Sequence, residues 1–485
     1  LIGHNIMGFD IPVLEKLTDI NLENINFIDT LILSRLFNPV REAGHSLDVW
    51  GKKLQYPKLD FKEFEEYTSE MLTYCVNDVR LNGVVYDYLL KEGREFSKDS
   101  IDLEHSVFKI TKQQELNGFK FNHIEASIFV ASLREQVTVL EDEVHSTFKP
   151  KLVDVKRVIP KLKKDGMLSK QGLTASEYIK RKVAKDTRPF MRQELKDFNL
   201  SSRQQIGAYL KDFGWEPTKF TPTGQPIVDE GSLSKIDNIP EAKLILEYLL
   251  LQKRIVQTES WISSLKEDGR VHGYVIPNGT ITGRMTHRNP NMAQVPSVSS
   301  PYGKECRSFW EVETGYKLVG VDASQLELRL LAHYMNDEDY IYEITKGDIH
   351  TYNQKLAGLK SRDEAKVFIY ALCYGAGNEK IGQIVGGNKT RGGQLRKRFF
   401  GSNPAFASLT TKVQRAARKK YFKGIDGRKL FVRSEHSALN TLIQGAGAIV
   451  MKKALIILDD VLKLNTVDYK FVANIHDEWQ IEVKE

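Results

Sequence analysis

The chain has 485 residues, of which 41% are hydrophobic, and a formal net charge of +7. This length exceeds one ordinary domain, so we expect two to four domains. No apolar stretch is expected to span a bilayer. The three distant cysteines, Cys75, Cys306 and Cys373, exclude a zinc spacing and a disulfide framework, which makes a reducing cytosol the default compartment.

Residues 1–95 alternate short apolar runs with helical patterns, as in an α/β sheet domain. The opening letters predict a strand that runs directly into a helix: IGHNIMGFDIPVL. Because the chain begins with Leu1 and stops eight residues after Asp477, we expect a fragment of a longer protein.

A basic stretch interrupts the helical middle of the chain. Residues 100–150 predict one or two helices, and residues 199–270 are mostly helical, ending in a long amphipathic run behind Pro240. Between them, residues 151–198 carry 14 basic and 6 acidic side chains, a local balance of +8 that leaves the remainder near −1. Such a stretch is either a solvated loop or a phosphate-binding surface.

Residues 271–345 predict strands and turns and then a helix, and residues 346–425 are helix-rich. Within the first segment, the β-rich run KLVGV ends at Asp322, and Ser324 would begin an amphipathic helix. Ser324 with Glu327 fits a capping box. An ordinary turn aspartate is the competing interpretation of Asp322.

Residues 430–485 predict a helix and then a strand pair with His476-Asp477-Glu478 at its tip. A solvated turn is again the competing interpretation. The hypothesis is that Asp322 and Asp477, 155 residues apart, converge. Mg²⁺ prefers oxygen ligands, and two ions roughly 4 Å apart can activate a hydroxyl and stabilise a leaving pyrophosphate.

A third pattern lies in residues 361–377, where four side chains recur every fourth position: Arg362, Lys366, Tyr370 and Tyr374. On a helix they line one face over about 18 Å, with the cations at the N-terminal end, where the dipole favours anions. The order suits the phosphate, sugar and base of a nucleoside triphosphate. The alternative is a solvated cation pair above a core stripe of tyrosines.

Together these segments resemble motifs A, B and C of family A DNA polymerases, in the correct order. VDASQLELR resembles motif A, the Arg362 to Gly375 series motif B, and His476-Asp477-Glu478 motif C. Further segments are similar to replicative polymerases of T-odd short-tailed bacteriophages: TGRMTHRNPNMAQVPS, SPYGKECR, GDIHTYNQ, DGRKLFVRS and LNTLIQGAGA. The resemblance covers nearly the whole chain.

The resemblance implies a role for each matching residue. Asp322 and Asp477 would be catalytic carboxylates that bind two Mg²⁺ ions with the Ala323 carbonyl, and Glu478 an auxiliary acid. The triphosphate contacts would be Arg362, Lys366 and His350, and Lys366 would also be able to protonate the leaving group. Glu327 would fill the space of a ribose 2′-hydroxyl. Tyr370, with its hydroxyl, would allow dideoxynucleotide incorporation.

The resemblance also implies contacts to primer-template DNA. Tyr374 would stack by the templating base. The other contacts would come from Arg284, Asn440, Gln444 and His476. Donors in the minor groove can test the shape of a base pair without reading its sequence, which suits a copying enzyme.

The N-terminal part resembles a DnaQ-like 3′–5′ exonuclease. HNIMGFD, with Asn5 and Asp10, resembles motif II, and Tyr74 with Asp78 resembles motif III. Asp10 and Asp78 would bind two further Mg²⁺ ions in a complete site. Motif I, a DxE pair, is missing; Asp102-Leu-Glu104 comes too late and is expected at the surface. We therefore expect this chain to lack exonuclease activity that its full-length parent has.

The expected fold is α/β plus α+β and multidomain: a ribonuclease H-like exonuclease domain followed by a right-hand polymerase. The expected boundaries are 1–95 for the partial exonuclease, 96–270 for the thumb with the basic insertion 151–198, 271–345 for the first part of the palm, 346–430 for the fingers and 431–485 for the truncated palm.

The expected partners are primer-template DNA, dNTPs and a replicative helicase-primase, for a monomer in the cytoplasm of the infected bacterial host with no membrane contact. Thioredoxin binding is doubtful, because the basic stretch is shorter than the thumb insertion that binds thioredoxin in the family. Three alternatives stay open: a single-subunit RNA polymerase, a stand-alone nuclease and a catalytically inactive DNA-binding fragment.

Overall fold

The computed structural model describes residues 1–20, 22 and 25–485. The chain divides into two compact units, which we describe separately. Unit 1 contains Leu1–Asn122, Ser264–Ser297 and Trp310–Glu485, and unit 2 contains His123–Ser263 and Val298–Phe309. Unit 2 thus begins at His123 and not at the thumb boundary expected at residue 96.

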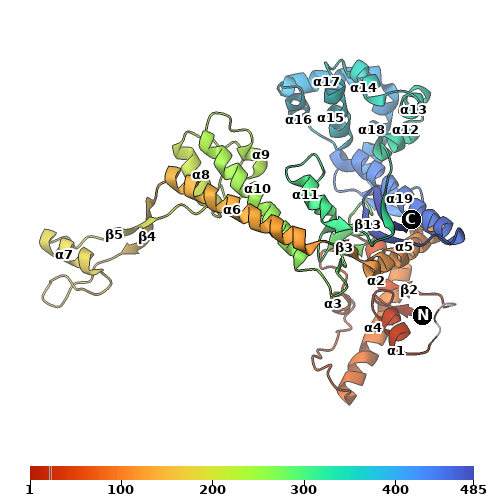
Figure 1. Ribbon diagram of the computed structural model, residues 1–485, viewed down its shortest axis with the longest axis horizontal. Coiled ribbons are helices and arrows are strands. Elements are labelled where there is room, and N and C mark those ends of the chain that lie inside the picture. The colour runs from red at the N-terminus through yellow and green to blue at the C-terminus, as the bar shows by residue number, and fades with distance from the viewer. Residues whose placement is uncertain (21, 23–24) are drawn as a thin grey trace. The chain divides into compact units, whose positions relative to one another are not determined.

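The N-terminal part of unit 1 is a short parallel strand pair with helices around it (Figure 1). Side chains of Asp29, Ser46 and Thr68 accept from backbone amides and start the second, third and fourth helices. Trp50 and Leu81 are fully buried in the shared core. The elements are β1 (Ile2–Gly3), α1 (Asp10–Leu17), β2 (Ile28–Asp29), α2 (Thr30–Phe37), α3 (Leu47–Leu54), α4 (Ser69–Glu92) and η1 (Gly93–Glu95).

The next helix, α5 (Lys98–Asn117), carries a buried carboxylate. Glu104 is fully buried and accepts hydrogen bonds from Lys452 and Arg428, both at 2.6 Å. The expectation that this segment lies at the surface is therefore wrong for Glu104. Burial alone would raise the pKa of Glu104, but the two cations hold it below its usual value.

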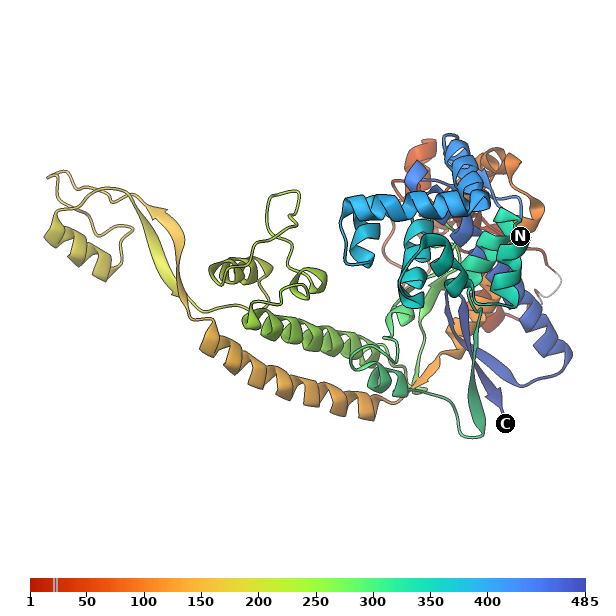
Figure 2. The ribbon, with the colours of Figure 1, turned by 90° about the horizontal axis from the view of Figure 1, so that it is seen from above.

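Unit 2 is built on two long helices, α6 (His123–Thr147) and α10 (Pro240–Ile262), which lie side by side in both ribbon views (Figures 1 and 2). The basic stretch forms an antiparallel hairpin that carries a helix. Pro240 starts α10 as expected. The remaining elements are β4 (Lys151–Val158), α7 (Ala175–Ala184), β5 (Phe190–Lys196), α8 (Arg203–Asp212), α9 (Glu230–Leu233) and α11 (Gly303–Ser308).

An antiparallel sheet in the order β10-β14-β13 carries both predicted carboxylates in unit 1. Its strands are β10 (Tyr316–Asp322), β13 (Tyr469–Ile475) and β14 (Glu478–Lys484), and its neighbours are α12 (Leu326–Met335) and α19 (Ala438–Leu464). Short elements complete this region: β3 (Phe119–Phe121), β6 (Arg270–Val271), β7 (Tyr274–Ile276), β8 (Thr286–Arg288), η2 (Met292–Gln294) and β9 (Trp310–Glu311).

A helical region with its own large core lies between α12 and α19 in the sequence. Its elements are α13 (Glu338–Thr345), α14 (Ile349–Ala357), α15 (Arg362–Cys373), α16 (Asn378–Ile384), α17 (Lys389–Ser402), α18 (Pro404–Ala417), β11 (Tyr421–Lys423), β12 (Lys429–Phe431) and η3 (Glu435–Ser437). Phe368 and Phe399 are fully buried at its centre.

Within the described residues, one helix, Glu435–Leu464, is long and apolar enough to cross a membrane, contrary to expectation. This helix qualifies by its length and composition alone, and 61% of its most apolar stretch of 18 residues is buried inside the structure. A core helix passes the same test, so this is weak evidence for a membrane span.

Candidate active site

Asp322 and Asp477 lie side by side because the strands that carry them are paired. β10 ends at Asp322, whose pairing partner across the sheet is Glu478. The backbone amide of Ala323 donates to the carbonyl of Asp477 at 3.0 Å. His476 and Asp477 form the two-residue turn between β13 and β14, and His476 adopts a left-handed φ of 58°. The expected hairpin with carboxylates at its tip is present.

This acidic corner fits a cation. Like charges directly opposite each other destabilise a sheet, and here Asp322 faces Glu478. No described Lys or Arg forms an ion pair with either of them or with Asp477. The described residues contain no group of three or more His, Cys, Asp or Glu side chains arranged to hold a metal. The carboxylates at this corner belong to Asp322, Asp477 and Glu478, and hard divalent cations prefer such oxygens.

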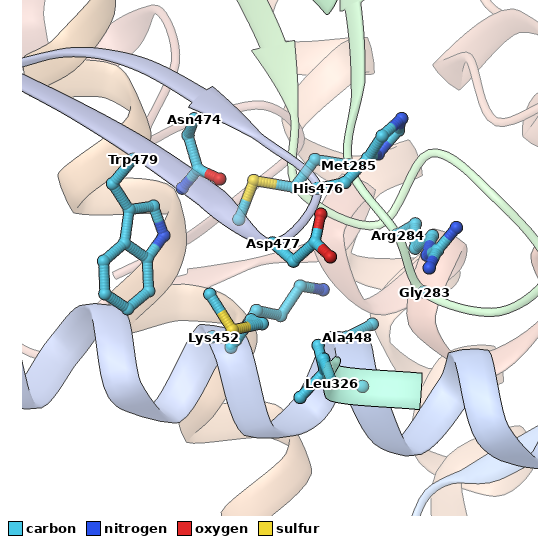
Figure 3. Close-up of a pocket in the computed structure, with 12 residues that line it drawn as sticks. Gly283, Arg284, Met285, Leu326, Ala448, Lys452, Asn474, His476, Asp477 and Trp479 are labelled. Atoms are coloured by element: carbon cyan, nitrogen blue, oxygen red, sulfur yellow. The ribbon is translucent and has the colours of Figure 1, made fainter. Parts of the chain in front are cut away.

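A small cavity of about 20 Å³ lies next to Asp477 and is shown in Figure 3. Asp477, Arg284, Asn474 and Lys452 line it above α19. Burial lowers the pKa of Lys452 to about 8, against the opposing effect of Glu104. Lys452 and Asn474 were missed in the sequence, where nothing distinguishes them from other helix and strand residues.

Helix α15 carries the predicted cation and tyrosine row and ends where Tyr374 caps it. Arg362 is already paired: its guanidinium donates to both oxygens of Asp348, at 2.7 and 3.1 Å. This pairing, with a hydrogen bond from Thr351, holds the pKa of Asp348 far below its usual value. Lys366 has no ion pair with any described residue, so it is free to meet an anion.

His350 lies near the cationic end of this row. It is 4% exposed, and its Nδ1 has no hydrogen-bond partner among the described residues. Burial, and then the nearby Arg362 and Lys366, lower the pKa of His350. A neutral imidazole beside two cations is suited to accept or donate a hydrogen bond to an incoming anion.

Glu327 joins two other predicted site residues and does not cap a helix. Its carboxylate accepts from Arg284 and from the Tyr374 hydroxyl, both at 2.7 Å. The expected capping box is wrong, because α12 begins at Leu326 after Gln325, which has a left-handed backbone and makes no side-chain cap. The ring of Tyr370 lies 6.2 Å, centroid to centroid, from that of Tyr374, whose hydroxyl donates to the same carboxylate. Burial, and then the negative charge of Glu327, raise the pKa of Tyr370.

A polar cleft of about 570 Å³ adjoins the acidic corner. All four of the other predicted DNA contacts line it: Arg284, Asn440, Gln444 and His476. Sequence reasoning missed Arg433, Asn291 and Gln294, which also line it. Gly375, which follows the end of α15, has a φ of 76°, and a Cβ there would lie 2.1 Å from the His436 carbonyl oxygen.

The predicted exonuclease residues are not brought together in the same way. Lys58 forms an ion pair with Asp78 at 2.8 Å and lies 5.0 Å from the centre of the Tyr74 ring. Asp10 starts α1, and burial followed by the charge of Asp29 raises its pKa. No described contact joins Asp10 to Asp78.

Asn5 has a left-handed φ of 62°, and its backbone amide donates to Asp29 at 2.9 Å. The binding of metal by Asp10 and Asp78 stays a prediction.

Comparisons with known proteins identify the family of the chain. The family model for DNA polymerase family A matches residues 170–485. The chain is 35% identical over 606 residues to the DNA-directed DNA polymerase of Enterobacteria phage T3 and 35% identical over 604 residues to that of Escherichia phage T7. Each alignment covers 99% of this chain and 86% of the relative.

A solved structure with the same fold is the POL domain of Pol1 from M. smegmatis, in complex with DNA primer-template and dNTP. It matches with a TM-score of 0.76 at 20% identity, over 94% of this chain and 75% of that one. The chain belongs to DNA polymerase family A, whose members use divalent metal ions, and it is a DNA-directed DNA polymerase.

Proposed function

We propose that Asp322 and Asp477, with the Ala323 carbonyl, hold two Mg²⁺ ions for nucleotidyl transfer. The observation that carries this is the pairing of β10 with β14, which puts two carboxylates without cation partners at one corner. Bound Mg²⁺ would supply charge neutralisation and activation of the primer hydroxyl. Glu478 adds negative charge on the same face and acts as an auxiliary acid.

The incoming dNTP lies along α15 in this proposal. Lys366 and His350 contact its phosphates, and Arg362 joins them by exchanging Asp348 for phosphate oxygens. Lys366 also protonates the pyrophosphate leaving group. Tyr370 lies beside the sugar, near Glu327, whose carboxylate fills the space of a 2′-hydroxyl. A fixed carboxylate discriminates better than a mobile one, and the bonds from Arg284 and Tyr374 fix it.

Primer-template DNA occupies the polar cleft. The M. smegmatis neighbour was solved with primer-template and dNTP, and the cleft offers neutral and cationic donors for minor-groove acceptors. Arg284, Asn440, Gln444 and His476 make these contacts. Burial, and then Arg284, lower the pKa of His476, which keeps its imidazole neutral at neutral pH. Tyr374, half exposed, stacks by the templating base.

The N-terminal part is proposed to be part of a ribonuclease H-like proofreading domain that is inactive in this chain. Lys58 pairs with Asp78 where a metal would be needed, and no contact of Asp78 with a second carboxylate is present among the described residues. We propose Mg²⁺ binding by Asp10 and Asp78 only in a site completed by further carboxylates.

The basic hairpin and helix of residues 151–198 are proposed to hold DNA electrostatically. The enzyme is proposed to act as a monomer with a helicase-primase in the cytoplasm of an infected bacterium, as fits the phage origin of the T3 and T7 relatives.

Primer extension tests the proposal. The chain should extend a DNA primer with dNTPs only when Mg²⁺ is present, and Asp322→Ala should remove extension without changing the melting temperature. Preference for rNTPs would indicate an RNA polymerase. DNA binding without extension, at any Mg²⁺ concentration, would indicate an inactive fragment and sink the proposal.

A further inference from the structure

His287, on the short strand β8, makes a contact that the proposed function does not use. Its side chain is 8% exposed, and its Nε2 lies 2.7 Å from the carbonyl oxygen of Asn474 on β13. A carbonyl oxygen can only accept, so Nε2 carries the hydrogen and donates it. Burial lowers the pKa of His287, although the hydrogen bond opposes this shift, and the imidazole is therefore neutral at neutral pH. The other ring nitrogen, Nδ1, has no hydrogen-bond partner among the described residues.

The Asn474 carbonyl needs a partner from outside its own sheet. β13 is an edge strand in the order β10-β14-β13. Ile475 pairs with Glu478 at the base of the two-residue turn, so Asn474, opposite Trp479, occupies a non-hydrogen-bonded position. Its carbonyl therefore points away from β14, and with Asn474 only 2% exposed it has little access to water. His287 satisfies an acceptor that would otherwise be buried and unpaired.

A buried histidine that satisfies a backbone carbonyl is usually structural, so the place of this contact decides its meaning. Asn474 is three residues before Asp477, and its side chain lines the same small cavity as Asp477 (Figure 3). Between them, His476 has a left-handed φ of 58°, a conformation that a residue other than glycine keeps only when its surroundings enforce it. The hydrogen bond from His287 fixes the strand that enters this turn.

The segment that carries His287 also holds a second residue of the proposed site. Arg284, two residues before β8, donates to the Glu327 carboxylate at 2.7 Å. β8 is paired with β7, and η2, which follows β8, packs against β13. Residues 284–288 are thus tied both to the Glu327 carboxylate and to the turn that carries Asp477.

We propose that His287 is a positioning residue for nucleotidyl transfer: by donating to the Asn474 carbonyl, it sets the position of the Asp477 carboxylate relative to Asp322. The proposal rests on the assignment of Asp477 as a metal ligand under the proposed function. His287 acts through the backbone of β13 and not by contact with DNA, dNTP or metal. Removal of a residue that orients a metal ligand from behind typically lowers metal affinity or activity by about 10- to 100-fold.

The test replaces His287 with side chains that differ in where they place a donor. His287→Gln keeps an amide N–H at nearly the reach of Nε2, whereas His287→Asn places its amide near the position of Nδ1 and cannot reach the carbonyl. Each enzyme is titrated with Mg²⁺ in a primer-extension assay at saturating dNTP. His287→Asn should raise the Mg²⁺ concentration for half-maximal extension about tenfold, and His287→Gln should stay within about twofold of the wild-type value. His287→Thr, which suits a strand and lacks the reach, is a second variant without the donor.

The matched control is His272→Leu, which removes an imidazole contact of the same 2.7 Å length, to the Glu115 carbonyl, elsewhere in unit 1. It should lower the melting temperature without changing the Mg²⁺ titration. Primer-template affinity, measured with Ca²⁺ in place of Mg²⁺, should stay within about twofold in every variant.

The same Mg²⁺ dependence in His287→Asn and His287→Gln would overturn the proposal. So would an equal shift in the His272→Leu control, or a loss of primer-template affinity at unchanged Mg²⁺ dependence, which would make His287 a DNA contact. Asp477→Asn separates the two levels of the argument. If that variant still extends primers, the proposed metal site is wrong; if it does not, while His287→Asn behaves like the wild-type chain, only the positioning role is wrong.

Discussion

The two acidic sites predicted for this chain call for the same metal chemistry, but the structure arranges their residues differently. At the predicted polymerase site, strand pairing fixes Asp322 opposite Glu478 and next to Asp477, and no described Lys or Arg forms an ion pair with them. At the predicted exonuclease site, Asp78 lies on a helix and pairs with Lys58, while Asp10 starts a different helix. A sequence motif thus identifies a carboxylate, whereas the fold decides which partners it meets.

The largest effect should come from removing one carboxylate at each site. Asp477→Asn should reduce primer extension by about 10³-fold or more, because several kcal/mol of charge stabilisation depend on the bound metal. Asp78→Asn, the matched change in the predicted exonuclease motif, should leave extension within about twofold, since Asp78 lies outside the proposed metal-binding corner. Single-turnover rates measure both. Equal losses would mean that the two sites are not independent.

Substitution of Glu327 tests whether its carboxylate discriminates between sugars at the proposed polymerase site. Glu327→Ala opens space beside the sugar, so discrimination against rNTPs should fall by about 10- to 200-fold. It also leaves the partly buried Arg284 without its carboxylate, which should cost about 1–3 kcal/mol of unfolding free energy. Competition between dATP and ATP measures the first effect, and chemical denaturation the second. Unchanged discrimination would remove Glu327 from the sugar site.

The substitution Tyr370→Phe removes a single hydroxyl group from the proposed polymerase site. In the proposed site this hydroxyl would replace the hydrogen bond that a dideoxynucleotide lacks, so its loss should reduce dideoxynucleotide incorporation by at least about tenfold. Incorporation of ordinary dNTPs should stay within about twofold. Rates with ddNTP and dNTP on one template give the ratio. If the two enzymes show the same ratio, Tyr370 does not contact the sugar.

The smallest expected effect on stability comes from Lys58, which pairs with Asp78 in the predicted exonuclease motif. Lys58→Gln should cost about 1 kcal/mol or less, because the pair with Asp78 is partly exposed and screened by solvent. The loss should shrink at high salt, and a double-mutant cycle with Asp78→Asn should isolate the pair. Single-strand degradation should stay absent in both variants. Vigorous Mg²⁺-dependent degradation of single strands by the wild-type chain or by either variant would refute the proposal that the N-terminal part is inactive.

The sequence pattern predicted the structure correctly where residues close together in the sequence determine it. The strand that ends at Asp322, the hairpin around Asp477 and the helix from Arg362 were expected and are present, because period and turn chemistry are local. The capping role of Glu327 failed, since Arg284 and Tyr374 compete for its carboxylate from distant segments. Glu104 failed for the same reason: its partners lie more than 300 residues away.

The cluster of cations in residues 380–434 was not predicted. The net charge near −1 outside residues 151–198 is an average, in which acidic residues elsewhere in the chain offset the 15 Lys and Arg side chains of this segment. Which of these cations pair with other residues depends on the fold and could not be read from their order along the chain.

The carboxylate of Glu104 bears on where this enzyme can be cut. A shortened polymerase that starts beyond α5 would leave Lys452 without its carboxylate partner and Arg428 with Asp426 alone, a loss of roughly 3–5 kcal/mol. The hydroxyl of Ser97 also donates to the Asp426 carbonyl, so trimming should stop upstream of that serine. Helix α5 therefore belongs with the polymerase part of the chain and should be kept in any shortened version of it.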